Sequence, residues 1–384
     1  MNDTDLHPGL EDIAVAETRL SAIDGEHGAL VIGGYPLAEL APNATYEESV
    51  YLLLHDRLPG AEAHDRFRTT LAGRRSIPDA VTSILRRAAA DESSAMDALR
   101  MGLAAATLDA DAEEAGADRA REEALRVIAV IPTIVAAYGR LRQGKEPVAP
   151  REDLGHAANY LYMLAGEIPS EARVRGLETY LNTVIDHGLN ASTFTARTVV
   201  STEADLVSAA TAAVGALKGP LHGGAPGPVL EMLKAVHDGG DPEAHVREKL
   251  EAGERLMGFG HRVYRARDPR ATVLSTAAER FYAQSDDEAF FKTAQELETV
   301  GTRLLSEHNP DRRLRTNVEF YTAVLLHGLG IPQELFTPTF AVSRAGGWMA
   351  HALEQKRDNR LVRPIARYVG DTGNAWTPIE KRTT

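Results

Sequence analysis

Helical periodicity over a long stretch is the feature that most restricts the fold of this chain. Between about Thr45 and Val200, nearly every segment is rich in Ala, Leu, Arg and Glu and repeats its apolar residues with a helical period. Gly or Pro separates these segments, and strand-like segments do not alternate with them as they would in an α/β fold. Helices are predicted over Ala61 to Ala72, Asp79 to Ala90, Ala95 to Leu108, Arg119 to Gly139, Leu154 to Leu164 and Glu171 to Ile185. The sequence therefore predicts an all-α protein.

The flanking segments fit this fold class. Residues 13–35 alternate in polarity around Asp24-Gly25, which predicts a minor two-stranded ribbon near the N-terminus. Thr45 and Glu48 have the spacing of a capping box at a helix start. Further helices are predicted over Thr202 to Leu217, over Met232 to Met257, and over Ala271 to Glu307 with an acidic turn at Ser285 to Glu288. The tail from about residue 372 is expected to be loose.

Composition excludes several classes of function. A net charge of -13 argues against nucleic acid or an anionic membrane as a main partner. The sequence has no cysteine, so a thiol nucleophile, a disulfide and a metal-thiolate site are excluded. The first residues are acidic and no run of 18 apolar residues occurs, so a cytoplasmic location is expected.

Two histidines lie among glycines within residues 219–270. His222 is in GPLHGGA and His261 is in GFGHRVYRARDPR. Glycine lets backbone and ligand approach closely, which favours a site over a structural role. The second motif also contains Arg262, Arg265, Arg267 and Arg270. Together with the backbone N–H groups of the glycines, these side chains suggest an anion clamp, and a solvated basic connector is the alternative.

Four further positions are candidates for chemistry. His187 and Asn190 are three residues apart in DHGLNAST and, if that segment is helical, would share one side of a helical turn and face the same ligand. Glu319 lies among apolar residues in TNVEFYTA, where partial desolvation would raise its pKa and suit a general base. Arg344 precedes two glycines and Arg363 precedes a proline. The structural alternatives are a helix-end histidine, a glutamate that binds helix N–H groups, and surface arginines.

Other catalytic classes lack their motifs. The sequence has no GxSxG elbow, no P-loop, and no GxGxxG between a strand and a helix. Neither HExxH nor any short His spacing supports a metal, so no metal ligand is predicted. Arginines, histidines and one carboxylate in separate glycine-marked segments indicate proton transfer on a polyanionic substrate.

Several motifs in this order resemble the citrate synthase family, in the short form typical of archaea and many bacteria. The resemblance extends from about Gly9 to Gly370. It rests on GPLHGGA, MGFGHRVYRARDPR, NVEFYTAVLLHGLGIP, FAVSRAGGWMAHALEQ and NRLVRPIARYVG, with support from DHGLNASTF and HAANYLYMLAGE.

The resemblance implies an all-α homodimer that condenses acetyl-CoA with oxaloacetate and water to give citrate and CoA. It further implies a small domain over residues 226–321 and a large domain over residues 1–225 and 322–384. No tightly bound cofactor is implied, because coenzyme A enters as a thioester substrate.

The resemblance also assigns roles to single residues. His222 would bond the thioester oxygen of acetyl-CoA, and His261 would polarise the ketone of oxaloacetate. Glu319 would be the base. The expected oxaloacetate ligands are His187, Arg270, Arg344 and, from the neighbouring subunit, Arg363, with Asn190 as a further substrate contact. The expected CoA-site residues are Met257, Gly258, Phe259, Gly260 and Arg265.

Glu319 departs from the family pattern, in which the base is an aspartate. The extra methylene moves the carboxylate by about 1 Å, and a displacement of that size can cost on the order of 100-fold in rate. Three interpretations stay open at this point. A locally adjusted backbone would leave an ordinary synthase, a different pocket would suit propionyl-CoA and give 2-methylcitrate, or the chain would be a non-catalytic paralogue that binds CoA or a dicarboxylate.

Overall fold

A computed structural model describes residues 6–107, 119–224, 226–261, 263–285, 287–310 and 314–382. Its first elements are η1 (Pro8–Leu10), β1 (Ser21–Asp24), β2 (Ala29–Ile32), β3 (Tyr35–Pro36), α1 (Leu37–Leu40), α2 (Tyr46–His55), α3 (Ala61–Ala72), α4 (Asp79–Ala90), α5 (Ala95–Ala104) and α6 (Arg119–Arg142). The chain continues with α7 (His156–Ala165), α8 (Glu171–Val184), α9 (Ala191–Ser201), α10 (Leu206–Leu217), α11 (Pro226–His237) and α12 (Pro242–Glu251). The last elements are α13 (Pro269–Tyr282), α14 (Glu288–His308), α15 (Val318–Gly328), η3 (Gln333–Leu335), α16 (Phe336–Arg357) and η4 (Ile379–Lys381).

Most predicted helices are confirmed, and the all-α class with them. The bounds of α3 and α4 agree with the prediction at both ends. The predicted capping box is also present, because the Thr45 side chain accepts from the Glu48 N–H while the Glu48 side chain accepts from the Thr45 N–H. Local signals of capping and periodicity therefore set these elements.

Three local predictions were wrong. The N-terminal ribbon has three antiparallel strands in the order β1-β2-β3, because the Gly33-Gly34 turn brings Tyr35 back to pair with Ile32. The helix predicted over residues 232–257 is two helices, since Gly239 at φ 112° breaks it before Asp241 caps α12. The helix predicted from Thr202 begins at Leu206, because Asp205 caps it through the Ser208 N–H.

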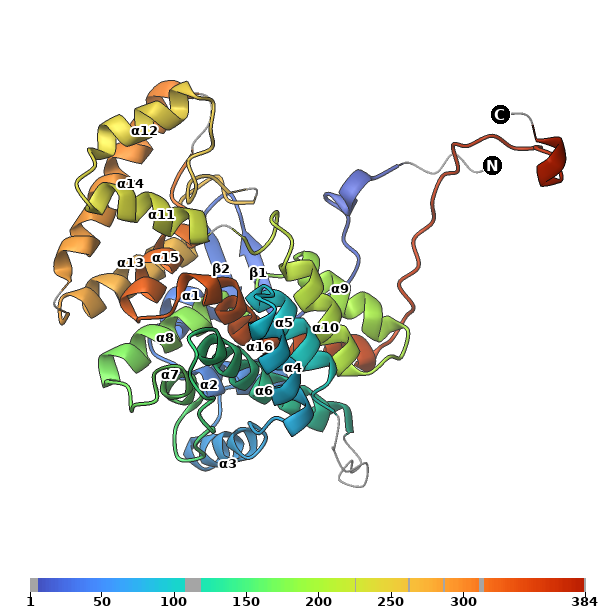
Figure 1. The fold of residues 1–384 in the computed structure, drawn as a ribbon, viewed down its shortest axis with the longest axis horizontal. Helices are drawn as coiled ribbons and strands as arrows, with labels where there is room; N and C mark the ends of the chain where they lie inside the picture. Colours follow the sequence, from blue (N-terminus) through green and yellow to red (C-terminus); the bar gives the residue numbers. More distant parts are fainter. Residues whose placement is uncertain are drawn as a thin grey trace.

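The helices form two groups. Helices α11 to α15 pack on one another in the upper left of Figure 1, and α2 to α10 surround α16 below them. The contact between α8 and α13 joins the groups. The division into a large and a small domain stays a prediction, and its boundary at residue 321 falls inside α15.

Helix α16 is the centre of the larger group. Its residues from Phe336 to Ala352 are almost all buried, among them Trp348. Glycine allows a close approach here, since a Cβ at Gly347 would lie 2.2 Å from the carbonyl oxygen of Ile185. The Gly346-Gly347 pair therefore lets α16 carry Arg344 up to the loop that follows α8.

Helix α6 is long and apolar enough to cross a membrane, but 83% of its apolar window is buried in the protein. It contacts α4, α5, α7 and α16. Its composition therefore reflects a position in the helical core.

Candidate active site

Three histidines and three charged side chains come together where α13, α15, α16 and the loop after α8 meet. The pKa of His187 responds to the charges of Arg270 and Arg344 and to His261. The His187 and His261 rings lie 5.9 Å apart between centroids. The charge of Arg344 also shifts the pKa of His222 and the pKa of Glu319, so these two side chains belong to the same group. The structure thus gathers residues from five separate sequence motifs.

The three imidazoles are neutral near pH 7. Burial, helped by the charges of Arg270 and Arg344, holds the pKa of His187 well below its usual range. Burial and the charge of Arg344 lower the pKa of His222 to about 4. Burial and the charge of Arg270 lower the pKa of His261 to about 4. Each ring therefore has one N–H donor and one nitrogen acceptor.

Hydrogen bonds determine which nitrogen of His261 carries the proton. The backbone N–H groups of Val263 and Tyr264 donate to its Nδ1 at 3.0 Å and 3.1 Å. The hydrogen is therefore on Nε2, which lies 3.0 Å from Nη2 of Arg270. A guanidinium can only donate, so two donors face each other at this point. Such a pair suits an oxygen acceptor from a ligand.

The tautomer of His222 follows in the same way. The backbone N–H of Ser192 donates to its Nε2 at 3.3 Å, and the Ser192 hydroxyl lies 2.8 Å from the same atom. Trp348 in α16 donates to the Ser192 oxygen at 3.0 Å and fixes the position of that hydroxyl. The N–H of His222 is therefore on Nδ1, the nitrogen that does not face Ser192.

Arg270 is a buried cation held by Asp268. Two guanidinium nitrogens of Arg270, Nε and Nη2, donate to the Asp268 carboxylate at 3.0 Å and 2.8 Å. The same carboxylate accepts from the Arg270 N–H at the start of α13 and from the Val318 N–H at the start of α15, at 3.0 Å and 3.2 Å. Asp268 thus links the two helix N-termini that carry Arg270 and Glu319.

Glu319 lies at the start of α15. Its carboxylate makes no hydrogen bond or ion pair with any residue that the structure describes, and the helix cap is supplied by Asn317, whose side chain accepts from the Glu319 N–H at 3.0 Å. Burial raises the pKa of Glu319 to about 7, with Asp268 adding to the effect while Arg270 and Arg344 oppose it. The predicted raised pKa is confirmed. The carboxylate can therefore take up a proton near neutral pH.

The glycine loop before His261 positions Glu319. Gly258 and Gly260 have φ values of 86° and 81°, which favour glycine. The N–H of Gly260 donates to Arg315 at 2.7 Å, and the carbonyl oxygens of Gly258 and Gly260 accept from Asn317 at 2.9 Å and 2.8 Å. The Gly260 N–H is therefore not free for an anion, contrary to the prediction.

The predicted anion clamp is reduced to Arg270 among the described residues. Arg265 is exposed and pairs with Glu26 at 3.0 Å, while Arg267 pairs with Glu298 at 3.0 Å. Arg262 lies outside the described residues. The prediction of a clamp was wrong for Arg267, because the side chains of this loop point in different directions and that of Arg267 reaches Glu298 instead.

Asn190 serves as a helix cap. Residues 187–190 precede the helix, because α9 begins at Ala191, so the condition for His187 and Asn190 to share one side of a helical turn is not met. The Asn190 side-chain oxygen accepts from the Thr193 N–H at 3.1 Å and from Ser192, and its amide donates to Gly188 and Thr193. These bonds use the polar atoms of the side chain to shape the loop that carries His187.

Arg363 lies away from these residues. Arg344 is 1% exposed and donates from Nε to the Val184 carbonyl at 2.7 Å, so the surface alternative is wrong for this arginine. Arg363 is exposed, and it lies on the C-terminal segment that leaves the body beyond α16 (Figure 1). The structure therefore unites His187, His222, His261, Arg270, Glu319 and Arg344 without Arg363.

Sequence reasoning missed several residues that shape the site. Tyr264 is 4% exposed, and its hydroxyl lies 3.0 Å from Nε2 of His187. Asp268 could have been found from the sequence Asp-Pro-Arg, since Asp before Pro is a frequent helix start. Ser192 and Tyr264 lie inside quoted motifs, but residue type and spacing gave them no role there, because only the tertiary contact defines it.

The β1–β2 turn supports the loop of His261. Arg265 donates its N–H to the carbonyl of Gly25 at 3.0 Å, and a Cβ on Gly25 would lie 2.3 Å from the carbonyl oxygen of Val263. We therefore expect Gly25→Ala to displace the loop and to lower kcat/KM by about tenfold, since small displacements of positioning groups are costly. Gly60→Ala is the control, because that site is open. Equal kinetics for both variants would contradict this role.

The chain is similar to known proteins over nearly its whole length. Residues 9–365 match the family model for the citrate synthase C-terminal domain. A citrate synthase of Haloferax volcanii is 45% identical over 98% of this chain and 99% of its own length, and a 2-methylcitrate synthase of Shewanella oneidensis is 35% identical over 97% of each chain.

A solved structure agrees with these relatives. The ternary complex of carboxymethyl coenzyme A and oxaloacetate with citrate synthase from Thermoplasma acidophilum is 30% identical. It superposes with a TM-score of 0.88 over 98% of this chain and all of that chain. The chain therefore belongs to the citrate synthase family of acyl-transferring transferases.

Proposed function

We propose that this protein condenses acetyl-CoA with oxaloacetate and water to give citrate and CoA. One observation carries the proposal: the His261 N–H and the Arg270 guanidinium converge at 3.0 Å near the Glu319 carboxylate, which no described residue hydrogen-bonds. A ketone oxygen is an acceptor that fits two converging donors. The relatives named above agree with this chemistry.

Residues are in place for the steps up to carbon–carbon bond formation, which gives a citryl thioester that water then hydrolyses to citrate and CoA. Arg270, Arg344 and His187 would hold the two carboxylates of oxaloacetate, since buried arginines bind carboxylates strongly. Glu319 would remove a proton from the methyl group of acetyl-CoA, and the His222 N–H would stabilise the enol oxygen as charge develops there. His261 would polarise the ketone that the enol carbon attacks.

Coenzyme A would enter as a thioester substrate beside Met257 to Gly260, and Arg265 would contact it from its exposed position. In this proposal no tightly bound cofactor or metal takes part. Among the described residues, no group of three or more His, Asp or Glu side chains is arranged to hold a metal ion.

The test is CoA release by the purified protein with oxaloacetate, with acetyl-CoA and propionyl-CoA compared. We expect acetyl-CoA to give the higher kcat/KM. A preference for propionyl-CoA would instead assign a 2-methylcitrate synthase, although one methylene in an apolar pocket changes binding by only about 1 to 3 kcal/mol. If both substrates bind and neither thioester is consumed, the chain is a non-catalytic paralogue.

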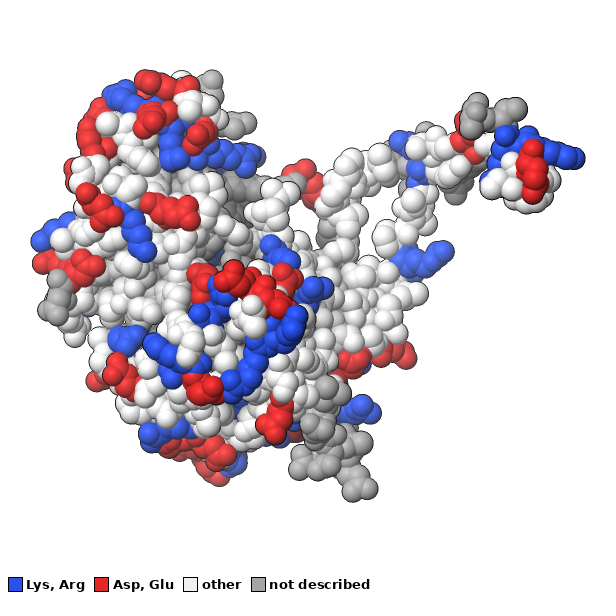
Figure 2. Space-filling model, viewed as in Figure 1, with Lys and Arg blue, Asp and Glu red and all other residues white. Residues whose placement is uncertain are grey.

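We also propose a homodimer in which Arg363 completes the site of the partner. The C-terminal segment exposes large apolar side chains, including Ile365 (73%), Val369 (90%) and Trp376 (80%). Figure 2 shows that uncharged side chains prevail along much of its length. Such a segment favours burial against a second copy.

Mixed dimers test this assignment. Arg363→Leu and His222→Ala are each expected to be inactive alone. Co-expression should restore about a quarter of the sites, because random pairing gives half heterodimers with one complete site each. No restoration in dimers shown to be mixed would place Arg363 in its own subunit or outside the site.

A further inference from the structure

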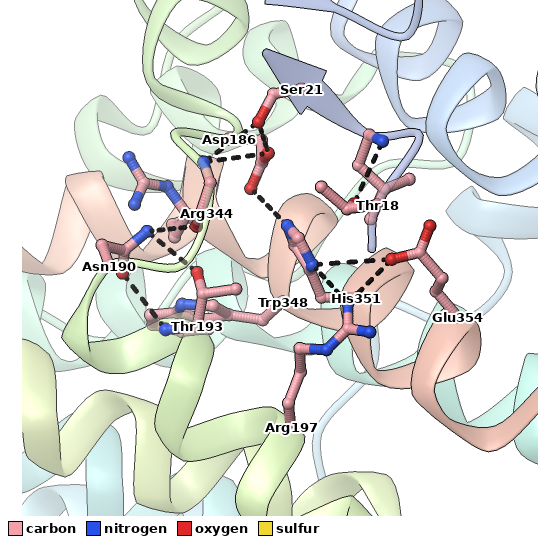
Figure 3. A network of polar contacts seen from close by, with 12 residues as sticks. Thr18, Ser21, Asp186, Asn190, Thr193, Arg197, Arg344, Trp348, His351 and Glu354 are labelled. Carbon is pink, nitrogen blue, oxygen red and sulfur yellow. Dashed lines mark hydrogen bonds and ion pairs between the residues drawn. The ribbon is translucent and has the colours of Figure 1, made fainter. Parts of the chain in front are cut away.

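A buried network of polar groups lies directly behind His187. Its centre is Asp186, which is fully buried. Oδ2 of Asp186 accepts from the Ser21 hydroxyl at 2.5 Å, and Oδ1 lies 3.1 Å from Nε2 of His351 (Figure 3). Ser21 also accepts from the Gly188 N–H at 3.0 Å, and this N–H lies 3.4 Å from Asp186. The network therefore holds the backbone at Gly188, the residue that follows His187.

Arg197 determines the protonation of His351. Nη1 of Arg197 lies 2.9 Å from Nδ1 of His351, and a guanidinium can only donate. His351 is therefore unprotonated at Nδ1, so its hydrogen is on Nε2 and points at Asp186. Arg197 is itself held by Glu354 at 2.7 Å and by Gln355 at 3.1 Å (Figure 3). The tautomer that donates to Asp186 is thus fixed by a second layer of contacts.

The carboxylate of Asp186 is ionised. Burial alone would raise its pKa, but His351, Arg344 and Ser21 favour the anion and hold the pKa below its usual range. Its negative charge acts in turn on Arg344: burial lowers the pKa of Arg344 to about 10, and Asp186 is the main group that opposes this. The buried carboxylate of Asp186 thus acts as a counter-ion for Arg344.

We propose that Asp186 is a positioning residue for the oxaloacetate carboxylates, which fixes the His187–Gly188 backbone through Ser21. Asp186 acts through its neighbours, because its oxygens are taken up by Ser21, Gly188 and His351. The inference rests on the proposed function for the identity of the ligand.

Ser21→Ala and Asp186→Asn test the proposal in the full-length protein. Thr183→Val is the matched control, because it removes a buried hydroxyl whose one hydrogen bond to a described residue goes to Thr179 in its own helix. We expect the oxaloacetate KM to rise about 3- to 10-fold for Ser21→Ala and roughly 10- to 100-fold for Asp186→Asn. The acetyl-CoA KM should change less than about twofold in both variants and in the control.

Direct binding separates this inference from the proposed function. Calorimetric titration with oxaloacetate should show the same loss of affinity, whether or not CoA is released. A lower Tm with unchanged oxaloacetate affinity would overturn the proposal and leave Asp186 a structural role. If Asp186→Asn does not fold, the oxaloacetate affinity of Ser21→Ala tests the proposal in its place. Wild type that binds oxaloacetate and releases no CoA contradicts the proposed function only.

Discussion

Replacing Glu319 by Gln is expected to lower kcat by at least about 100-fold, as loss of a general base does. Gln keeps the size of the side chain and cannot take a proton from a methyl group. Since no described residue bonds the Glu319 carboxylate, the fold should survive the change. Steady-state kinetics with acetyl-CoA and oxaloacetate give the measurement, and near-wild-type kcat would remove Glu319 from the mechanism.

The pH dependence of kcat provides a second measurement on the same residue. Burial raises the pKa of Glu319 to about 7, so the reactive carboxylate is lost as the pH falls below that value. We expect kcat to decrease toward low pH with a midpoint near this pKa, if substrates leave it unchanged. If kcat stays constant from pH 5 to 8 while the protein remains folded, Glu319 does not act with this pKa.

The raised pKa of Glu319 should also make the stability of the protein depend on pH. A carboxyl group whose pKa is raised in the folded state favours folding when protonated, and that contribution is lost as the pH rises from its unfolded pKa through the folded one. Glu319→Gln removes the buried charge. Its Tm should therefore exceed that of wild type above pH 7 and approach it near pH 4.

Glu319→Asp tests the departure from the family pattern. Asp keeps the charge and withdraws the carboxylate by about 1 Å, which can cost on the order of 100-fold when the backbone is fitted to the longer side chain. An increase in kcat on this replacement would show that the backbone at the start of α15 still suits an aspartate.

Replacing Arg344 by Met is the second change with a large expected effect. Arg344 is fully buried beside the His187 loop, and Met fills similar space without charge. Truncating one partner of a buried charge pair costs about 2 to 5 kcal/mol, so the oxaloacetate KM should rise by roughly 100-fold or more. The acetyl-CoA KM should change less than the oxaloacetate KM, because the proposed function assigns Arg344 to the carboxylates of oxaloacetate.

Arg66→Met is the matched control for this change. Arg66 lies on α3 and pairs with Glu62 at the surface, where 66% of its side chain is exposed. Surface ion pairs contribute about 0 to 1 kcal/mol, so this variant should keep the kinetics of wild type. Equal oxaloacetate KM values for the two variants would remove Arg344 from the substrate site.

Local interactions account for what the sequence alone determined. The bounds of α3 and α4, the Thr45–Glu48 capping box and the all-α class follow from period, caps and breakers within a few residues. The same reasoning singled out His187, His222, His261, Glu319 and Arg344 by their glycine-rich or apolar neighbours. Residue type and immediate sequence context were sufficient for these predictions.

Tertiary structure alone decided which of these side chains meet and how they are protonated. Arg267 and Arg270 lie in one motif, yet Arg267 pairs with Glu298 while Arg270 is buried against Asp268. The neutral state of the histidines depends on burial by distant helices, and the tautomer of His351 depends on Arg197, 154 residues away in the chain. Periodicity and spacing carry no signal for such contacts, because burial and hydrogen-bond partners arise only when separate helices pack together.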